Sequence, residues 1–355
     1  MRLNISDSTA TVRFNHVRST TPAYTIVLLV LLVGASELLV RTKFFRSHII
    51  ATDWGSAHNQ FETQLGRLQT VVANTGSIDC IFMGSSMVWH AFDPGEFSRV
   101  YNEETGREMK CFNFGVDGGV AATAGVLAPI LVQDYQPRYL IFGTDARDYA
   151  VRFDATDVTV QLDTSWVRYR QGDITLRGWL YEHAHFSRAW ESLGHLVRFQ
   201  KTHLAVRGAS TLDSSHYGFR PLDAVADYVM MSPLEHLDMP PVRYYHDLLS
   251  SYRIVPENVR GLKAIVALQD EKTKVIIVEM PVPETYLDFF GQGEEDYQLF
   301  ISTVQGVANA HDVPFWLTRP LQMIPADGWM DYTHLNTKGA RLFSRWLAEN
   351  MAEVR

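Results

Sequence analysis

Cysteine is scarce in this chain, which has only Cys80 and Cys111 among its 355 residues. Each cysteine lies in a short apolar run typical of a buried strand, which favours two buried thiols. A single disulfide is the alternative, and it requires the two strands to be neighbours with suitable geometry. Cysteine usage therefore leaves the redox compartment open.

Positive charge is also in short supply, because 32 lysines and arginines face 40 acidic residues, for a formal net charge of −8. A mildly acidic protein repels phosphate backbones, so nucleic acid is not an expected partner. The 13 histidines are scattered. The nearest thing to a ligand pair is His183 and His185, and surface or packing roles are favoured over metal binding there. We expect neither a metal nor a cofactor.

The chain shows no internal repeat and no low-complexity tract. Hydrophobic residues make up 46% of it, the share of an ordinary globular protein, which argues against disorder. The length is ample for a full hydrophobic core. One large domain, alone or with an insertion, is the expected organisation.

One long hydrophobic run, residues 23–40, contains a single charge, Glu37. As a helix it spans about 27 Å, close to the roughly 30 Å of a bilayer's hydrocarbon core. Glu37 precedes Arg41 by four positions, so the two can pair at the membrane interface. A buried helix of a soluble protein and a cleaved signal peptide are alternatives. No convincing A-x-A cleavage site follows the run, which favours an uncleaved transmembrane helix.

Five short apolar runs predict buried parallel strands, at residues 78–84, 109–115, 138–144, 274–281 and 313–317. Helical patterns are expected between and after them, at 119–132, 257–269, 295–310 and 338–351. Alternating strands and helices predict an α/β fold with a doubly wound, parallel, five-stranded sheet.

The remaining segments complete the predicted organisation. Residues 1–22 form an N-terminal tail, 41–75 a linker and helix, and 76–355 the main domain. The linker's helix carries apolar residues at helical spacing, namely Phe61, Leu65, Leu68 and Val72. Residues 150–255 break the strand–helix pattern, and a helix is expected at 183–205. We interpret 150–255 as a mainly helical insertion or lid.

Chemically capable residues follow the predicted strands, at the sheet edge where ligands of open α/β sheets bind. Ser86 follows the first strand, and a serine at a strand-to-helix turn exposes its hydroxyl and N–H where negative charge is favoured. Asp331 and His334 precede the last helix. Their spacing lets the carboxylate hold one imidazole nitrogen while the other accepts the serine proton. Gly118 follows the second strand, and its N–H can serve an oxyanion.

Each of these signals is weak alone, but their order along the chain resembles the SGNH, or GDSL-like, hydrolase superfamily. The family's Gly-Asp-Ser motif matches Gly84-Ser85-Ser86, with Ser85 in place of the aspartate. Its oxyanion-hole glycine falls on Gly118, and its final D-x-x-H motif matches Asp331 and His334. The resemblance covers residues 78–150 and 256–352. It implies a flavodoxin-like sheet and a catalytic triad of Ser86, His334 and Asp331.

The family's third motif, G-x-N-D, falls on residues 143–146, where Asp145 stands in place of the asparagine. The resemblance implies an oxyanion hole of Ser86, Gly118 and residue 145. An ionised carboxylate, however, cannot donate a hydrogen bond to an oxyanion and repels it. Three explanations stay open: Asp145 is protonated and still donates, it pairs with Arg147, or the site is nearly inactive.

Four further residues near the motifs are expected to bind substrate on the acceptor side, namely Arg147, Asp148, His90 and Asp93. For Arg147 and Asp148 the alternative is a surface ion pair, which contributes little to stability.

A single N-terminal span before such a domain is similar to membrane-anchored proteins that modify cell-surface polymers. These include the D-alanylation protein of lipoteichoic acid and the SGNH-like acetyltransferases of alginate. The resemblance implies a large domain outside the cytoplasm, a glycan or polymer substrate and a polytopic acyltransferase as partner. Charge does not decide the orientation, because three basic residues lie on each side of the span (Arg2, Arg13, Arg18; Arg41, Lys43, Arg46).

The expected function is thus a membrane-anchored serine esterase or O-acyltransferase that forms an acyl-enzyme on Ser86. Two alternatives remain. One is an inactive domain that binds a glycan or partners a membrane acyltransferase, and the other is a flavodoxin-like domain without ester chemistry.

Overall fold

The computed structural model describes residues 21–48, 59–150, 164–186 and 217–353. Its centre is a parallel sheet of β1 (Cys80–Gly84), β2 (Cys111–Gly115), β3 (Tyr139–Thr144), β4 (Lys274–Glu279) and β5 (Phe315–Trp316). The strand order is β2-β1-β3-β4-β5, the order of flavodoxin-like doubly wound sheets. The predicted α/β fold class is confirmed.

The strands form where the sequence has unbroken apolar runs, because both faces of the sheet are covered by helices. All four residues from Cys80 to Met83 are buried, and so is the whole of β2 and β3. The fifth strand is shorter than the predicted 313–317, since only Phe315 and Trp316 pair with β4.

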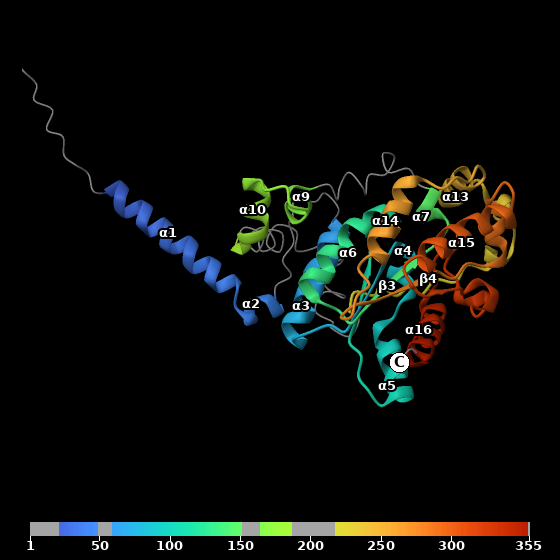
Figure 1. Cartoon of the computed structure of the whole chain (residues 1–355), viewed down its shortest axis with the longest axis horizontal. Coiled ribbons are helices and arrows are strands. Elements are labelled where there is room, and N and C mark those ends of the chain that lie inside the picture. The colour runs from blue at the N-terminus through green and yellow to red at the C-terminus, as the bar shows by residue number, and fades with distance from the viewer. Residues whose placement is uncertain (1–20, 49–58, 151–163, 187–216, 354–355) are drawn as a thin grey trace, which may run out of the picture.

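The principal helices around the sheet are α3 (Asn59–Thr75), α4 (Ser86–Ala91), α5 (Pro94–Thr105), α6 (Ala121–Tyr135), α14 (Pro256–Val266), α15 (Glu294–Asn309) and α16 (Thr337–Glu353). In Figure 1, α6 and α14 lie above the sheet, and α5 and α16 lie below it. The four helices predicted between and after the strands are all present, within a few residues of their expected bounds. In α3, Phe61, Leu65 and Leu68 point into the core, as their spacing predicted.

The short helix α7 (Arg147–Ala150) follows β3. The described part of the insertion contains α9 (Ser165–Arg170), α10 (Leu176–His183) and α13 (Pro240–Leu249), with 3-10 turns η3 (Asp227–Met230) and η4 (Pro233–His236). It is mainly helical, as expected. Of the helix predicted at 183–205, His183 is the last residue of α10, residues 185 and 186 are helical after a break at Ala184, and residues 187–205 lie outside the described residues. Further short elements are η5 (Glu284–Phe289), η6 (Arg319–Leu321) and η7 (Ala326–Gly328).

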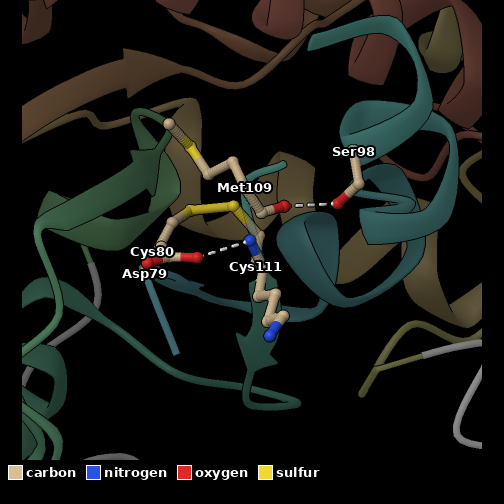
Figure 2. Close-up of a disulfide and its surroundings, with 6 residues drawn as sticks. Asp79, Cys80, Ser98, Met109 and Cys111 are labelled. Carbon is tan, nitrogen blue, oxygen red and sulfur yellow. Dashed lines mark hydrogen bonds between the residues drawn. A yellow bond between two sulfur atoms is a disulfide. The ribbon is translucent and has the colours of Figure 1, made fainter. Parts of the chain in front are cut away.

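The two cysteines form a disulfide, which corrects the interpretation of two buried thiols. Cys80 and Cys111 are partners in the register of β1 and β2, with Cα atoms 4.4 Å apart. Figure 2 shows the bond beside two further links at the strand starts. The Lys110 N–H donates to Asp79 over 2.9 Å, and the Ser98 hydroxyl donates to Met109 O over 2.6 Å. The strands are neighbours, which is the condition that a disulfide required.

The hydrophobic run at residues 23–40 is helical and forms most of α1 (Thr21–Val40), which α2 (Lys43–His48) follows. It is long and apolar enough to cross a membrane, and it is the only such helix among the described residues. Val40 is its one buried hydrophobic side chain, which does not fit a buried helix of a soluble domain. Glu37 and Arg41 form the predicted ion pair at 2.7 Å.

Candidate active site

Three side chains from opposite ends of the domain meet at the carboxyl edge of the sheet. The Nε2 atom of His334 lies 2.9 Å from the Ser86 hydroxyl oxygen, and its Nδ1 atom lies 2.8 Å from an Asp331 carboxylate oxygen. All three residues are partly exposed. A serine, a histidine and a carboxylate linked in this order can activate the serine as a nucleophile. The structure thus brings the predicted triad together, while its role in catalysis stays a prediction.

The turn from β1 into α4 presents Ser86 at a helix N-terminus. Ser85 is the N-cap residue, and its hydroxyl accepts a hydrogen bond from the Met87 N–H over 3.4 Å. Ser86 is therefore the first helical residue, where the backbone N–H has no partner within the helix. Gly84 permits this turn, because a Cβ atom there would collide with the carbonyl oxygen of Gly143 on β3. The short motif thus combines a helix cap at Ser85, a partly exposed serine at Ser86 and close strand packing at Gly84.

The loop before α16 holds Asp331 ready to orient His334. One oxygen of the Asp331 carboxylate accepts the N–H groups of Thr333 and His334, both over 2.8 Å, and the other faces the imidazole. Burial raises the pKa of Asp331, but the hydrogen bond from His334 and the nearby N–H groups outweigh it. The pKa of Asp331 therefore lies below its ordinary value. The carboxylate stays ionised and fixes the tautomer in which Nδ1 carries the proton.

The second strand leads into a turn that packs against Gly84 and Ser85. Gly118 adopts φ of 69°, a left-handed conformation that glycine reaches without strain. A Cβ atom on the neighbouring Gly119 would lie 3.4 Å from Gly84 O and 3.7 Å from the Ser85 Cα atom. The N–H of Gly119 donates to Val116 O over 2.9 Å. The turn thus lies beside Gly84 and Ser85, the residues that precede Ser86, and the use of the Gly118 N–H for an oxyanion stays a prediction.

Asp145 is buried directly after β3, and 1% of its surface is exposed. One carboxyl oxygen, Oδ2, accepts a hydrogen bond from the Tyr286 hydroxyl over 3.0 Å. The other, Oδ1, is buried with no hydrogen-bond partner among the described residues. A bare, ionised oxygen in such a place is costly, whereas a protonated carboxyl has a donor to offer. Burial raises the pKa of Asp145 above its ordinary value.

Arg147 pairs with Asp148 and not with Asp145, which corrects the second explanation offered for the oxyanion hole. The Arg147–Asp148 distance is 3.3 Å. Asp148 also accepts the Thr144 hydroxyl over 3.1 Å and the Asp145 N–H over 3.4 Å. Burial and the neighbouring Asp145 carboxyl raise the pKa of Asp148 well above its ordinary value. Asp148 has the guanidinium and two further donors, whereas Asp145 has one donor and one bare oxygen, so the donor pattern favours the negative charge on Asp148.

Arg147 and Asp148 lie in the interior, which differs from both readings of the sequence. Only 8% of Arg147 and 1% of Asp148 are exposed. They therefore form neither a surface ion pair nor an exposed surface that could bind an acceptor. The guanidinium donates instead to Gly119 O over 3.0 Å and to Gly118 O over 3.3 Å. Arg147 therefore ties the loop after β3 to the turn that carries Gly118.

His90 lies next to the candidate base, whereas Asp93 does not. The His90 ring meets the His334 ring edge-on, with centroids 5.3 Å apart, and its Nδ1 lies 2.8 Å from Arg220 O. Burial lowers the pKa of His90 to about 4, so its ring is neutral at neutral pH. Asp93 caps α5, where its carboxylate accepts the N–H of Gly95 over 2.9 Å. One carboxylate oxygen of Asp93 is thus held by the helix terminus, and the expected contact of Asp93 with substrate stays a prediction.

Several residues that support the site could not be found from the motifs. Gln60 of α3 donates to Gly115 O over 2.8 Å and accepts the Asp117 N–H over 3.0 Å, so it holds the start of the Gly118 turn. Arg220 of the insertion and Tyr286 of η5 contact His90 and Asp145. None of these stands near a motif in sequence. Gln60 lies in the predicted linker and helix at 41–75, where no sequence pattern marks it as part of a site.

No family model matches the chain, and no curated protein matches it either. Among solved structures, it is similar to a carbohydrate acetylesterase from Sinorhizobium meliloti, with 10% identity and a TM-score of 0.36 over 79% of this chain and 100% of that one. An aryl esterase from M. smegmatis matches at 11% identity and a TM-score of 0.36, over the same shares of the two chains. A putative arylesterase from Agrobacterium tumefaciens matches at 12% and 0.32, over 78% and 100%. These likenesses are remote, and the function proposed below rests on the site's own geometry.

Proposed function

We propose that this chain is a serine esterase or O-acyltransferase that works through an acyl-enzyme on Ser86. The observation that carries the proposal is the continuous hydrogen-bonded chain from Ser86 through His334 to Asp331, at 2.9 and 2.8 Å. Ser86, at one end of this hydrogen-bonded series, is the first residue of α4, and it follows Gly84 and Ser85, which lie beside the turn of Gly118 and Gly119. A polar triad of this kind next to free backbone N–H groups suits acyl transfer better than it suits packing.

In the proposed reaction, the Ser86 oxygen attacks the ester carbonyl while Nε2 of His334 takes the hydroxyl proton. The carbonyl oxygen becomes an oxyanion, held by the N–H groups of Ser86 and Gly118. Collapse of the intermediate breaks the ester bond, and the protonated His334 gives its proton to the leaving alcohol. Water, or a sugar hydroxyl, then repeats the attack on the acyl-enzyme and releases Ser86. Hydrolysis and transfer share every step up to the acyl-enzyme.

The third oxyanion donor in this proposal is the protonated carboxyl of Asp145. Its Oδ1 is buried without a hydrogen-bond partner among the described residues, while Asp148 forms the ion pair with Arg147. A carboxylic acid kept neutral in an apolar site can donate a hydrogen bond to an oxyanion. Asp145 can then do what an asparagine does in the resembling family, over the pH range in which it holds its proton.

Ser86→Ala is the decisive variant for the reaction, with Ser85→Ala as its matched control. The first should lower the hydrolysis of a small acetyl ester by several orders of magnitude, because members of a triad act as a unit. The second removes only a cap hydrogen bond and costs about 1 kcal/mol of stability. Steady-state kinetics on purified protein measure both. The opposite ranking would overturn the assignment of Ser86.

The proposal includes a membrane anchor at residues 23–40, with the domain outside the cytoplasm and an O-acetyl or similar ester of a cell-surface glycan as substrate. Two observations support this placement. The helix is apolar enough to span a bilayer, and its side chains are exposed. The Cys80–Cys111 disulfide suits an oxidising compartment, since cytosolic thiols are kept reduced.

The alternative is a domain without catalysis that binds a glycan or partners a polytopic acyltransferase. The observation that favours it is the carboxyl of Asp145 where an asparagine is expected, because an ionised Asp145 would oppose an oxyanion. Under this alternative Ser86→Ala changes no rate, and purified wild-type protein turns over no ester.

A further inference from the structure

An exposed apolar surface lies on the insertion, at the α9–α10 hairpin. It consists of Ile174, Leu176, Trp179 and Leu180, which we call the apolar tip. Ile174 is 85% exposed and Leu176 75%, although both are large aliphatic side chains. Single exposed apolar residues are common, but a group on one short hairpin is the usual mark of an interaction surface.

The hairpin is firmly held on its polar side. The Trp166 indole of α9 donates to Glu182 of α10 over 2.6 Å. Arg170 pairs with Asp134 of α6 at 2.5 Å and with Glu182 at 3.4 Å. These contacts fix the hairpin to the main domain. The polar contacts of the hairpin face the main domain, and the apolar tip is left exposed to solvent.

The same hairpin is fastened to the end of α1. The Arg41 guanidinium donates to His183 O over 2.9 Å, at the last residue of α10. The Glu37 carboxylate accepts the N–H of His185 over 3.2 Å and that of Phe186 over 2.8 Å. Figure 1 shows α10 standing beside the C-terminal part of α1. The hairpin is thus placed at the depth where α1 ends.

From this position we propose that the apolar tip inserts into the membrane's interfacial layer beside α1. The inference rests on the proposed anchoring of residues 23–40. If α1 spans the bilayer, its last turn lies at the interface, and a surface fastened to that turn meets lipid. Aliphatic side chains enter the acyl boundary, and tryptophan prefers the interface itself. We assign lipid as the partner of the apolar tip because the hairpin is hydrogen-bonded to the last turn of α1.

The consequence is a domain held at two points. A single helix joined to a domain by a short linker leaves the domain free to swivel. The apolar tip, together with α1, fixes one face of the domain toward the membrane. Because the hairpin also contacts α6, the orientation of the active-site edge of the sheet is set by the same contact.

The test uses the full chain in vesicles of phosphatidylethanolamine and phosphatidylglycerol. An environment-sensitive fluorophore is attached to one new thiol at a time, since the native cysteines are paired. The positions are Ile174→Cys in the tip, Leu31→Cys in α1, and Leu321→Cys, a 51% exposed residue on η6. Lipids carry a nitroxide either near the headgroup or near mid-chain.

At position 174 the emission should shift to the blue on vesicle binding, and the headgroup nitroxide should quench it more than the mid-chain nitroxide. Position 31 should be quenched best at mid-chain, and position 321 should be quenched by neither. Turnover of a small acetyl ester by each labelled protein shows that the fold is intact.

A label at 174 that is as unquenched as that at 321, while 31 is quenched, would overturn the proposal. The tip would then face a protein partner. Loss of quenching at 31 as well would show that the anchor itself is wrong, and the proposal would fall with it. The two failures are therefore distinct.

Discussion

At the scale of single residues, the proposed proton on Asp145 connects the burial of its carboxyl to the rate of ester cleavage. Its carboxyl has one donor, Tyr286, and one bare oxygen, whereas its neighbour Asp148 receives three donors that include Arg147. The sequence exposed the departure from the family motif and framed its possible explanations. It could not choose among them, because Tyr286 stands far from Asp145 in the chain and its contact follows from tertiary packing.

Asp145→Asn should separate the explanations through pH. Because burial raises its pKa, Asp145 keeps its proton to higher pH than an ordinary aspartate and loses the donor role as the pH rises through its folded pKa. The wild-type kcat/KM should fall as the pH rises through that value, and the asparagine variant should lack that fall while matching wild type below it. Asp145→Ala should cost about 100- to 1,000-fold, as for loss of one oxyanion donor.

The same substitution has a matching effect on stability. The folded chain holds a proton on Asp145 that the unfolded chain releases above its ordinary pKa. That contribution is fully present at low pH and is lost as the pH rises through the folded pKa. Asp145→Asn should therefore remove this contribution to the fall of the Tm between the ordinary pKa of an aspartate and the folded pKa of Asp145. A large gain of activity at neutral pH, from a wild type at background, would show instead that Asp145 is ionised and the site is inactive.

At the scale of elements, most of the fold could be predicted because the strands of a parallel sheet are buried on both faces. Such strands appear in the sequence as unbroken apolar runs. That is how β1 to β4 and the helices α6 and α14 to α16 were found. The cysteine interpretation was wrong because parallel register, which sets Cys80 beside Cys111, is a property of the assembled sheet. The insertion was recognised only by its break in the pattern.

The loop after β3 and the turn after β2 act as one unit through Arg147. Arg147→Lys keeps the charge but cannot reach both Gly118 O and Gly119 O as a fork. We expect kcat to fall with little change in KM, because the turn that carries Gly118 loses a hydrogen bond while the residues that contact the substrate are unchanged. Arg147→Ala should also lower the free energy of unfolding by about 3–5 kcal/mol, since Asp148 keeps a buried, unpaired charge.

Arg99 provides the matched control, because its ion pairs with Glu96 and Glu103 are exposed. Arg99→Ala should change stability by less than about 1 kcal/mol and leave the kinetics unchanged. Denaturant unfolding and steady-state kinetics measure both variants. An effect of Arg147→Lys on KM alone would contradict the positioning role and return Arg147 to direct substrate contact.

At the scale of the whole molecule, α1 and the domain differ in where their apolar residues lie. The apolar residues of α1, the proposed anchor, are exposed, whereas those of the sheet are covered by helices. The sequence predicted the span from its length and composition. The contacts that join α10 to the end of α1 depend on residues 142 to 149 positions apart, and no local pattern signals them.

The disulfide offers a test of the compartment in which the domain folds. In intact cells, a membrane-permeant alkylating reagent should modify Cys80 and Cys111 only after reduction, if the domain lies outside the cytoplasm. Replacing Cys80 by Val and Cys111 by Ala should lower the free energy of unfolding by about 2–5 kcal/mol. Rapid alkylation of both thiols without reductant would contradict the proposed orientation.

The account's central claim is that Ser86 is an activated nucleophile, and an active-site-directed fluorophosphonate tests it most directly. Mass spectrometry of the treated, folded protein should find one adduct, on the peptide that contains Ser86. The adduct should persist in Ser85→Ala and disappear in Ser86→Ala. It should also be lost in His334→Ala, because the hydroxyl then has no base. An adduct on another residue, or none on folded wild-type protein, would contradict the account.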